Sequence, residues 1–230
     1  FTSIAEMYKH YQPDVCVIAT PVQVIKTMCQ DIHLYARNTP LVTDFGSTKA
    51  EILSHIDQQS LSRIRFVGSH PMTGSHNAGY AYADRDLYKN AVCFVTPTET
   101  VDGTDVEIIV SLWRELGSNV VCLSPSEHDK IVSRISHLPH AVAFSLVDTV
   151  AKTGDEGFKY AGGGFRDFTR IAGSDAKMWL DIFETNRTNV LADLKNFQQS
   201  VSKLIGIIEE GDQEKIYRYL KRISDYRRQE

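Results

Sequence analysis

Short apolar runs alternate with amphipathic stretches along the first part of the chain. Strands are predicted at 14–19 (DVCVIA, buried), 40–45 (PLVTDF) and 65–68, because each is a brief apolar run closed by turn residues. Helices are predicted between them, at 22–36 and 48–58, where apolar residues recur at helical spacing. Strands and helices that alternate in this way form βαβ units, and these units build a parallel sheet.

The same alternation continues further along the chain. A short helix is predicted at 3–11, ahead of the first strand. Two more strands, at 91–96 and 119–123, flank an amphipathic helix at 105–116. Gly117 follows that helix directly and is a usual helix stop.

The pattern becomes helical from Ser124 onward. Ser126, which acidic residues follow, is predicted to start a helix. This helix should reach Lys152, with a kink at Pro139, because proline removes a backbone donor. A glycine-rich connection at 154–164 comes next.

The last part of the chain is dominated by long amphipathic patterns. Residues 165–172 are predicted to be short and irregular. Asp175 then caps one long helix over 176–210, Gly211 breaks it, and a final helix covers 213–228.

The chain is therefore predicted to be α/β followed by all-α. The first domain should cover residues 1–123 and the second, helical domain residues 124–230.

Charge and composition exclude several classes of partner. A formal net charge of −4 gives no reason to expect binding to nucleic acid or to an anionic membrane. No apolar run is long enough to span a bilayer, and the first residues lack the apolar core of a signal peptide. The four cysteines lie far apart, which favours free thiols in a reducing cytoplasm over disulfides or zinc: Cys16, Cys29, Cys93 and Cys122.

Polar residues follow three of the predicted strands, where a parallel sheet binds ligands. Thr20 and Pro21 follow the first strand, Asp44 and Ser47 the second, and His70 the third. A neutral imidazole there can accept a proton near pH 7, although this stretch alone slightly favours a turn histidine that bonds its own loop. Ser47 either meets an anion at a helix start or is an ordinary N-cap, and Asp44 could cap the same turn.

The helical half carries two further polar pairs. His137 and His140 are three residues apart and so lie near one helix face. No carboxylate or cysteine stands at a matching position, so no metal site is predicted. Arg166 and Arg170 follow three glycines and could bind carboxylates, or form a salt-bridged loop with Asp167.

One expected motif is missing. A dinucleotide-binding sheet opens with a strand and G-x-G-x-x-G, and this sequence contains no such motif. We expect an N-terminally truncated chain that binds dinucleotide weakly or not at all.

Six stretches carry a resemblance to a known family, in that family's order: VIATP (17–21), TDFGSTKAEI (43–52), GSHPMTGSHNAG (68–79), LYKNAVCFVTPT (87–98), EHDKIVSRISHLPHAVAFSLV (127–147) and GGGFRDFTRIAGSDAKMW (162–179). Together they resemble the prephenate dehydrogenase / arogenate dehydrogenase family of tyrosine biosynthesis. The resemblance implies a partial Rossmann-type domain, a helical dimerisation domain and a homodimer. It also implies an oxidoreductase that decarboxylates prephenate to 4-hydroxyphenylpyruvate with NAD, or NADP.

The resemblance also implies roles for individual residues. His70 matches the histidine that takes the proton of the ring hydroxyl, and Ser47 the serine that holds this histidine and the cofactor. His137 matches a histidine of the substrate pocket. The remaining matches concern binding: Arg170, Arg166, Gly74 and Ser75 for the substrate, and Thr20, Pro21, Asp44 and Ser47 for the cofactor.

Three other interpretations stay open. The preferred substrate could be arogenate, which gives tyrosine directly. The chain could be a catalytically impaired fragment that acts as a dimeric module, as the missing glycine motif suggests. A related dehydrogenase of hydroxy acids would share the architecture, but the GSHPM and SHLPH stretches together are not expected there.

Overall fold

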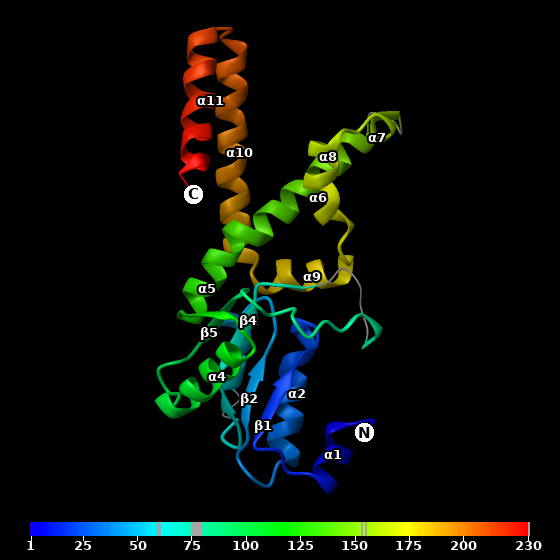
Figure 1. Ribbon diagram of the computed structural model, residues 1–230, viewed down its shortest axis with the longest axis vertical. Helices are drawn as coiled ribbons and strands as arrows, with labels where there is room; N and C mark the ends of the chain where they lie inside the picture. The colour runs from blue at the N-terminus through cyan, green and yellow to red at the C-terminus, as the bar shows by residue number, and fades with distance from the viewer. Residues whose placement is uncertain (59–60, 75–79, 153, 155, 230) are drawn as a thin grey trace.

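The computed structural model describes residues 1–58, 61–74, 80–152, 154 and 156–229. A mixed layer of strands and helices lies at one end of the molecule, and long helices extend away from it (Figure 1). Among the described residues, no helix is long and apolar enough to cross a membrane.

Six strands among the described residues form the sheet layer: β1 (Val15–Ile18), β2 (Leu41–Asp44), β3 (Arg65–Phe66), β4 (Gly68–Pro71), β5 (Val92–Thr96) and β6 (Asn119–Cys122). The predicted parallel pairing is confirmed for β1–β2–β3, and β5 and β6 are also parallel. Strands β4 and β5 pair antiparallel. The backbone N–H of Val67 donates to the carbonyl of Val42 at 2.9 Å, so the segment that carries β3 and β4 joins the two halves of the sheet.

The sequence predicted that the third strand stops at Gly68, but in the structure the extended chain goes on past this residue. It continues as β4, where His70 lies opposite Phe94 of β5. Gly68 lies in β4 and not in a turn, and it allows the strand to pack closely against Thr96. A Cβ atom at this position would lie 2.5 Å from Oγ1 of Thr96. His70 is therefore held in a strand and not in a loop.

The four α-helices of this layer lie where they were predicted: α1 (Ile4–His10), α2 (Val22–Tyr35), α3 (Ala50–Gln58) and α4 (Gly103–Glu115). A short 3-10 turn that the sequence did not predict, η1 (Tyr80–Tyr82), lies between β4 and β5. Gly117 adopts φ +87° just after α4, a backbone conformation that favours glycine, and so ends the helix.

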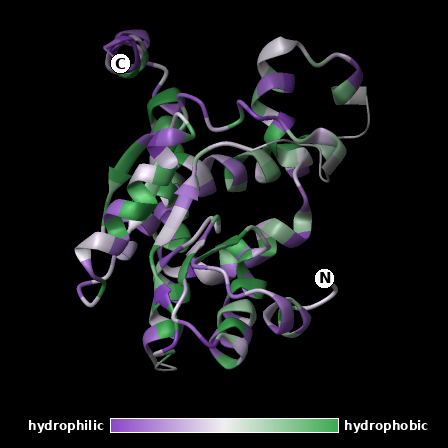
Figure 2. Cartoon of the chain, turned by 60° about the horizontal axis from the view of Figure 1, so that its bottom comes forward, coloured by the Kyte–Doolittle hydropathy of each residue, from purple (hydrophilic) through white to green (hydrophobic). Residues whose placement is uncertain are grey.

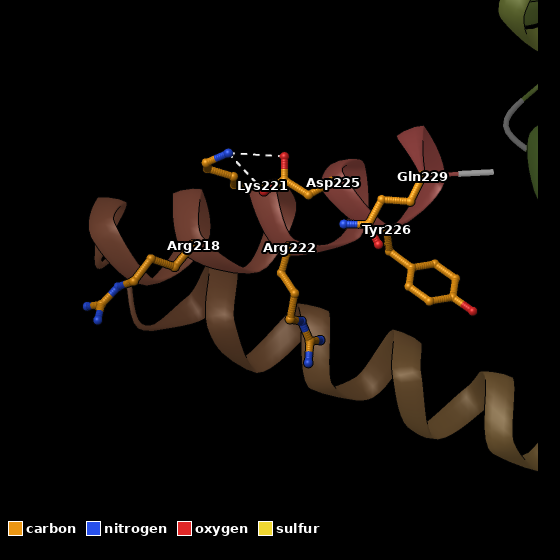
Figure 3. A pocket seen from close by; sticks show the side chains of 6 residues that line it. All are labelled: Arg218, Lys221, Arg222, Asp225, Tyr226 and Gln229. Atoms are coloured by element: carbon orange, nitrogen blue, oxygen red, sulfur yellow. Dashed lines mark hydrogen bonds and ion pairs between the residues drawn. The ribbon is translucent and has the colours of Figure 1, made fainter.

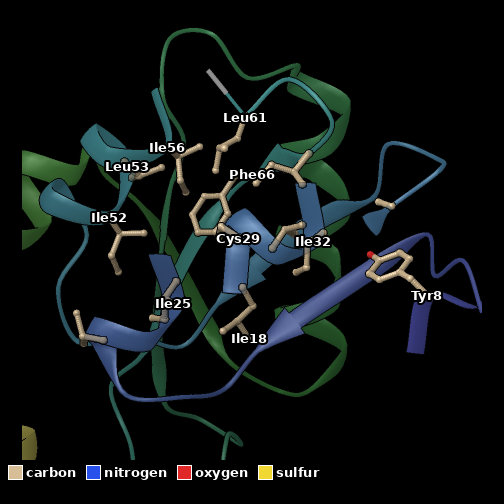
Figure 4. Close-up of a cluster of buried hydrophobic side chains, with 14 residues drawn as sticks. Tyr8, Ile18, Ile25, Cys29, Ile32, Ile52, Leu53, Ile56, Leu61 and Phe66 are labelled. Carbon is tan, nitrogen blue, oxygen red and sulfur yellow. The ribbon is translucent and has the colours of Figure 1, made fainter. Parts of the chain in front are cut away.

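Two hydrophobic clusters hold the layer together. In Figure 4, Ile25 and Cys29 of α2 and Ile52 of α3 belong to one buried cluster with Phe66 of β3. In the second cluster, Trp113 of α4 is fully buried and packs with Val67 and Val95 of the sheet layer. Burial of such side chains contributes about 1.5–3 kcal/mol each.

Strand β1 is less buried than predicted. Val15 and Val17 keep 41% and 47% of their surface exposed, whereas Ile18 keeps 2%. The reason is its position, since β1 lies at one edge of the described sheet.

The second half is helical, as predicted, and the described residues after β6 contain no strand: α5 (Pro125–Val132), a π-helical turn η2 (Ser133–His137), α6 (Leu138–Ala151), α7 (Glu156–Lys159), α8 (Gly163–Thr169), η3 (Arg170–Gly173), α9 (Ala176–Thr185), α10 (Arg187–Glu209) and α11 (Gln213–Arg228). Helices α10 and α11 form an antiparallel hairpin that projects from the rest (Figure 1). Figure 2 shows hydrophobic and hydrophilic segments alternating along the helices, as in amphipathic helices.

Three predictions in this half were wrong in detail. Residues 165–172 are helical, in α8 and η3. The long helix is two helices, because Asn186 leaves helical geometry at φ −117° and ψ 26°. Pro139 lies in the first turn of α6, where its missing N–H costs little, and the π-helical turn before it absorbs the irregularity.

The start of α5 also differs from the prediction. Its N-cap is Ser124 and not Ser126. The hydroxyl of Ser124 accepts from the backbone N–H of Glu127 at 3.2 Å, and the Glu127 carboxylate accepts from the backbone N–H of Ser124 at 3.1 Å. This is a capping box, which Pro125 follows at the first helical position.

Replacement of Ser124 by alanine should lower the free energy of unfolding by about 1 kcal/mol, because the backbone N–H of Glu127 loses its hydroxyl acceptor. The matched control is Ser126→Ala, in the same turn, which should change it by less than about 0.5 kcal/mol. Urea denaturation of both variants measures the difference. Equal effects of the two substitutions would contradict the assignment of the cap.

Candidate functional site

The centre of the candidate site is His70, at the edge of β4. Its Nδ1 lies 2.9 Å from Nε2 of His128, on α5, and the two rings meet edge to face. His70 is partly buried, and its Nε2 has no hydrogen bond within the described part of the chain. Burial, together with the charges that His128 and Lys49 can carry, holds the pKa of His70 well below its ordinary value. The imidazole is thus neutral at pH 7 and can accept a proton.

His128 is fully buried and bonds in turn to its neighbour Asp129, with Nδ1 2.8 Å from the carboxylate oxygen Oδ1. The same carboxylate accepts the backbone N–H groups of Lys49 at 2.8 Å and Ala50 at 3.0 Å. These N–H groups lie at the N-terminal end of α3, where a negative charge is stabilised. Asp129 therefore connects the helical half to the sheet layer.

A buried ion pair lies under the same loop. Lys49 donates to the carboxylate of Asp44, and both side chains are fully buried. Lys49 also donates to the carbonyl of Ser69 at 2.9 Å, and Asp44 accepts the backbone N–H of Gly46 at 2.8 Å. The carboxylate of Asp44 thus points into the protein and caps its own turn, the alternative that the sequence left open.

Ser47 lies in this loop, one position before Thr48, and is partly buried. The structure contains no hydrogen bond between Ser47 and His70, both of which are described residues. The hydroxyl of Thr48 instead bonds to that of Thr185 at 2.9 Å, which ties the loop to α9. The predicted support of His70 by Ser47 stays a prediction, whereas the observed support comes from His128.

His137 is almost fully buried, and its ring contacts other protein groups. It keeps 1% of its surface, and its Nδ1 lies 3.2 Å from the amide nitrogen of Asn186. The same amide donates to the backbone carbonyl of Asp129 at 2.8 Å. Burial lowers the pKa of His137 to about 4, so it is neutral at pH 7.

His140 is the more accessible of the two histidines. Its ring stacks on Trp179 with 3.9 Å between centroids, and Nδ1 donates to the carbonyl of Ser136 at 2.9 Å, which leaves Nε2 as an acceptor. Burial and the nearby charge of Arg170 lower the pKa of His140, although its bond to Ser136 opposes this. Trp179 is buried, and its indole N–H has no partner within the described residues. His140, Trp179 and Arg170 thus form a second polar cluster.

The other predicted site residues are more dispersed. Arg166 and Gly74 are exposed, on α8 and after β4 respectively. Thr20 and Pro21 follow β1 directly, and the Thr20 hydroxyl oxygen is buried without a partner among the described residues. Ser75 lies outside the described residues.

Sequence reasoning missed the roles of His128, Lys49 and Asn186, and used Asp129 only as a helix-start signal. The adjacent His128 and Asp129 early in a helix were the available signal. Their contacts to His70 and α3 span 58 and about 80 positions of sequence, so no local pattern reveals them.

The fold and this edge of the sheet define a class, namely a nucleotide-binding α/β layer joined to a helical layer. Residues 2–122 match the family described as prephenate dehydrogenase, nucleotide-binding domain, and residues 124–222 match prephenate dehydrogenase, dimerization domain. The chain belongs to the prephenate dehydrogenase family.

Individual relatives agree with this. The chain is 39% identical over 217 residues to prephenate dehydrogenase of Bacillus subtilis (strain 168), which covers 92% of this chain and 58% of that protein. It is 32% identical to prephenate dehydrogenase of Lactococcus lactis subsp. cremoris (strain MG1363), over 91% of this chain and 59% of that protein. The chain thus spans less than two thirds of these curated relatives.

A solved structure is similar over the whole chain. The crystal structure of prephenate dehydrogenase from A. aeolicus, in complex with hydroxyphenyl propionate and NAD+, superposes with a TM-score of 0.92 at 35% identity. The match covers 100% of this chain and 80% of that one.

Proposed function

We propose that this chain carries the catalytic centre of a prephenate dehydrogenase, which converts prephenate to 4-hydroxyphenylpyruvate and CO₂ with NAD+. The observation that carries the proposal is His70: a neutral, partly buried imidazole at a sheet edge, with one nitrogen bonded to His128 and the other without a hydrogen bond among the described residues. The family match and the A. aeolicus complex with NAD+ support it. NADP and arogenate are the alternatives in cofactor and substrate.

The proposed chemistry gives His70 the role of base. As the ring carbon that carries the hydroxyl loses hydride, its oxygen becomes more acidic, and Nε2 of His70 accepts the hydroxyl proton. The bond to the ring carboxylate breaks, CO₂ leaves, and the bonding electrons complete the aromatic ring. The resulting phenolate oxygen then takes the proton back from His70, which gives the hydroxyl of the product. A positioned base of this kind contributes about 10²–10⁴-fold to the rate.

The cofactor supplies the hydride acceptor when it is bound. The unpartnered hydroxyl of Thr20, just beyond β1, fits a polar group of a dinucleotide at the carboxyl edge of the sheet. Pro21 and Ser47 are the neighbouring residues that we propose to line it. The residues present thus fit part of a dinucleotide site.

The second cluster suits the anionic end of the substrate. Prephenate carries two carboxylates, and we propose that Arg170 binds one of them, with Arg166 as a second cation nearby in sequence. The indole N–H of Trp179 and Nε2 of His140, neither of which has a hydrogen bond within the described part of the chain, offer further polar contacts. Gly74, Ser75 and His137 remain proposed pocket residues by resemblance.

We also propose a homodimer formed by the helical half, with domains at 1–123 and 124–230. Apolar side chains stay exposed along the hairpin of α10 and α11: Leu191, Phe197, Val201, Ile205, Ile208, Leu220 and Ile223. Figure 3 shows a pocket lined by residues of α11 and by Gln229 just after it, with Lys221 bonded to Asp225. Sedimentation equilibrium tests the proposal, since the mass of a monomer would contradict it.

The four free thiols fit a cytoplasmic location, which we propose as well.

The reaction is tested with the full-length protein. Prephenate and NAD+ should yield NADH, CO₂ and 4-hydroxyphenylpyruvate in equal amounts, whereas arogenate should react more slowly. NADH absorbance and product chromatography measure this. A protein that binds NAD+ but oxidises neither compound would contradict the proposed function.

Replacement of Arg170 by glutamine should raise KM for prephenate about 10–100-fold, because a hydrogen bond to a charged group is worth about 1.5–3 kcal/mol. The value of kcat should change less than KM, since Arg170 is proposed to bind the substrate and not to take part in proton or hydride transfer. Steady-state kinetics measure both constants. Arg114→Gln, which replaces an exposed arginine on α4, is the control. An unchanged KM in the Arg170 variant would make Arg170 a purely structural residue.

A further inference from the structure

A continuous line of hydrogen bonds runs from the start of α3 to His70. It passes from the N–H groups of Lys49 and Ala50 to the carboxylate of Asp129, then to His128, and ends at Nδ1 of His70. Both linking side chains are buried, with 0% exposed for His128 and 2% for Asp129. The proposed reaction makes no direct use of either residue.

The direction of each hydrogen bond along this line follows from the carboxylate of Asp129. A carboxylate oxygen can only accept, so Nδ1 of His128 must donate to Asp129. Burial lowers the pKa of His128, although Asp129 opposes this, and a neutral imidazole carries one N–H. Nε2 of His128 is therefore an acceptor, and Nδ1 of His70 must donate to it. The single N–H of His70 is thus used, and its Nε2 keeps a lone pair.

We propose that His128 and Asp129 are positioning residues that hold His70 in the Nδ1–H tautomer, with the Nε2 lone pair available to the substrate hydroxyl. This inference rests on the proposed function and deepens it. The opposite tautomer would place a hydrogen on Nε2, and His70 could not accept the proton. After the transfer, the positive His70 donates to His128, and His128 donates to Asp129, so each N–H keeps its acceptor.

A purely structural role predicts something different. The contacts of Asp129 with α3 join the two halves of the chain, and this function needs no particular hydrogen position on His70. A structural role would therefore change thermal stability, with no preference for one tautomer of His70.

The first test is direct and needs neither substrate nor cofactor. The full-length protein is labelled with ¹⁵N-histidine, and long-range ¹H–¹⁵N NMR at pH 7 reports which ring nitrogen carries the hydrogen. The His70 signals are assigned by their loss in His70→Asn. We expect hydrogen on Nδ1 of both His70 and His128. Hydrogen on Nε2 of His70 would overturn the proposal.

The second test uses a pair of variants. His128→Phe keeps a ring but removes the acceptor, so the His70 hydrogen should shift to Nε2 and kcat should fall about 100-fold, while KM changes less than about threefold. In His128→Gln the amide oxygen can accept the hydrogen bond from Nδ1 of His70, so kcat should be about tenfold higher than in His128→Phe. Wild-type kcat in the phenylalanine variant would overturn the inference. Failure of the proposed function would be seen separately, as absence of NADH formation by the wild-type protein.

Discussion

Replacement of His70 by asparagine is expected to lower kcat for prephenate oxidation about 10²–10⁴-fold, with a modest change in KM. Asparagine can keep a polar contact to His128 but has no basic nitrogen for the hydroxyl proton. Steady-state NADH formation by the full-length protein measures both constants. His10→Asn, which replaces an exposed histidine at the end of α1, is the matched control and should leave both unchanged. A wild-type kcat in the His70 variant would remove this residue from the role of base.

The pH dependence of the wild-type enzyme gives an independent check. His70 acts in its neutral form, and burial, His128, Lys49 and His137 all lower its pKa. Activity that depends on His70 should therefore persist below pH 6.5, the ordinary pKa, and fall only as the imidazole becomes charged at lower pH. A decline of kcat/KM that begins above pH 6.5 would contradict this assignment.

Replacement of Lys49 by methionine should lower the free energy of unfolding by about 3–5 kcal/mol. The substitution leaves the carboxylate of Asp44 buried without its cation, and the carbonyl of Ser69 without the Lys49 donor. Removal of one partner of a buried pair costs more than the pair itself contributes, because the remaining charge is neither hydrated nor paired. Urea denaturation followed by circular dichroism measures the change.

Two further variants make this test specific. Lys9→Met replaces an exposed lysine of α1 and should change stability by less than about 0.5 kcal/mol. The double substitution Asp44→Asn with Lys49→Met removes both charges and should recover much of the lost stability. A loss below about 1 kcal/mol in Lys49→Met would mean that water reaches the Asp44 carboxylate.

Elements with strong local signals were predicted well. Helix α4 has apolar residues at helical spacing and a terminating Gly117, and the structure places it at Gly103–Glu115. The start of α5 was misplaced by two residues, because Ser124 and Ser126 are similar caps in sequence. Only the position of Glu127, three residues after Ser124, completes a capping box.

The candidate site was predicted in part. His70 was found, since a histidine beside a strand end is visible in sequence, but its setting in β4 was not. Antiparallel pairing with β5 depends on a strand more than twenty residues away, and no local periodicity reports it. In the same way, Asn186 looked like one residue of a long helix, whereas it interrupts that helix and contacts His137.

The sequence by itself determined the alternation of strands and helices in the first half, the change from α/β to helical at Ser124, and the family resemblance. Hydrophobic periodicity and residue identity are local properties, and they carry this information. The tertiary structure alone decided which groups meet: His128 with His70, Asp129 with the start of α3, and buried Lys49 with Asp44. Burial sets the protonation of these groups, and burial depends on packing between segments far apart in the chain.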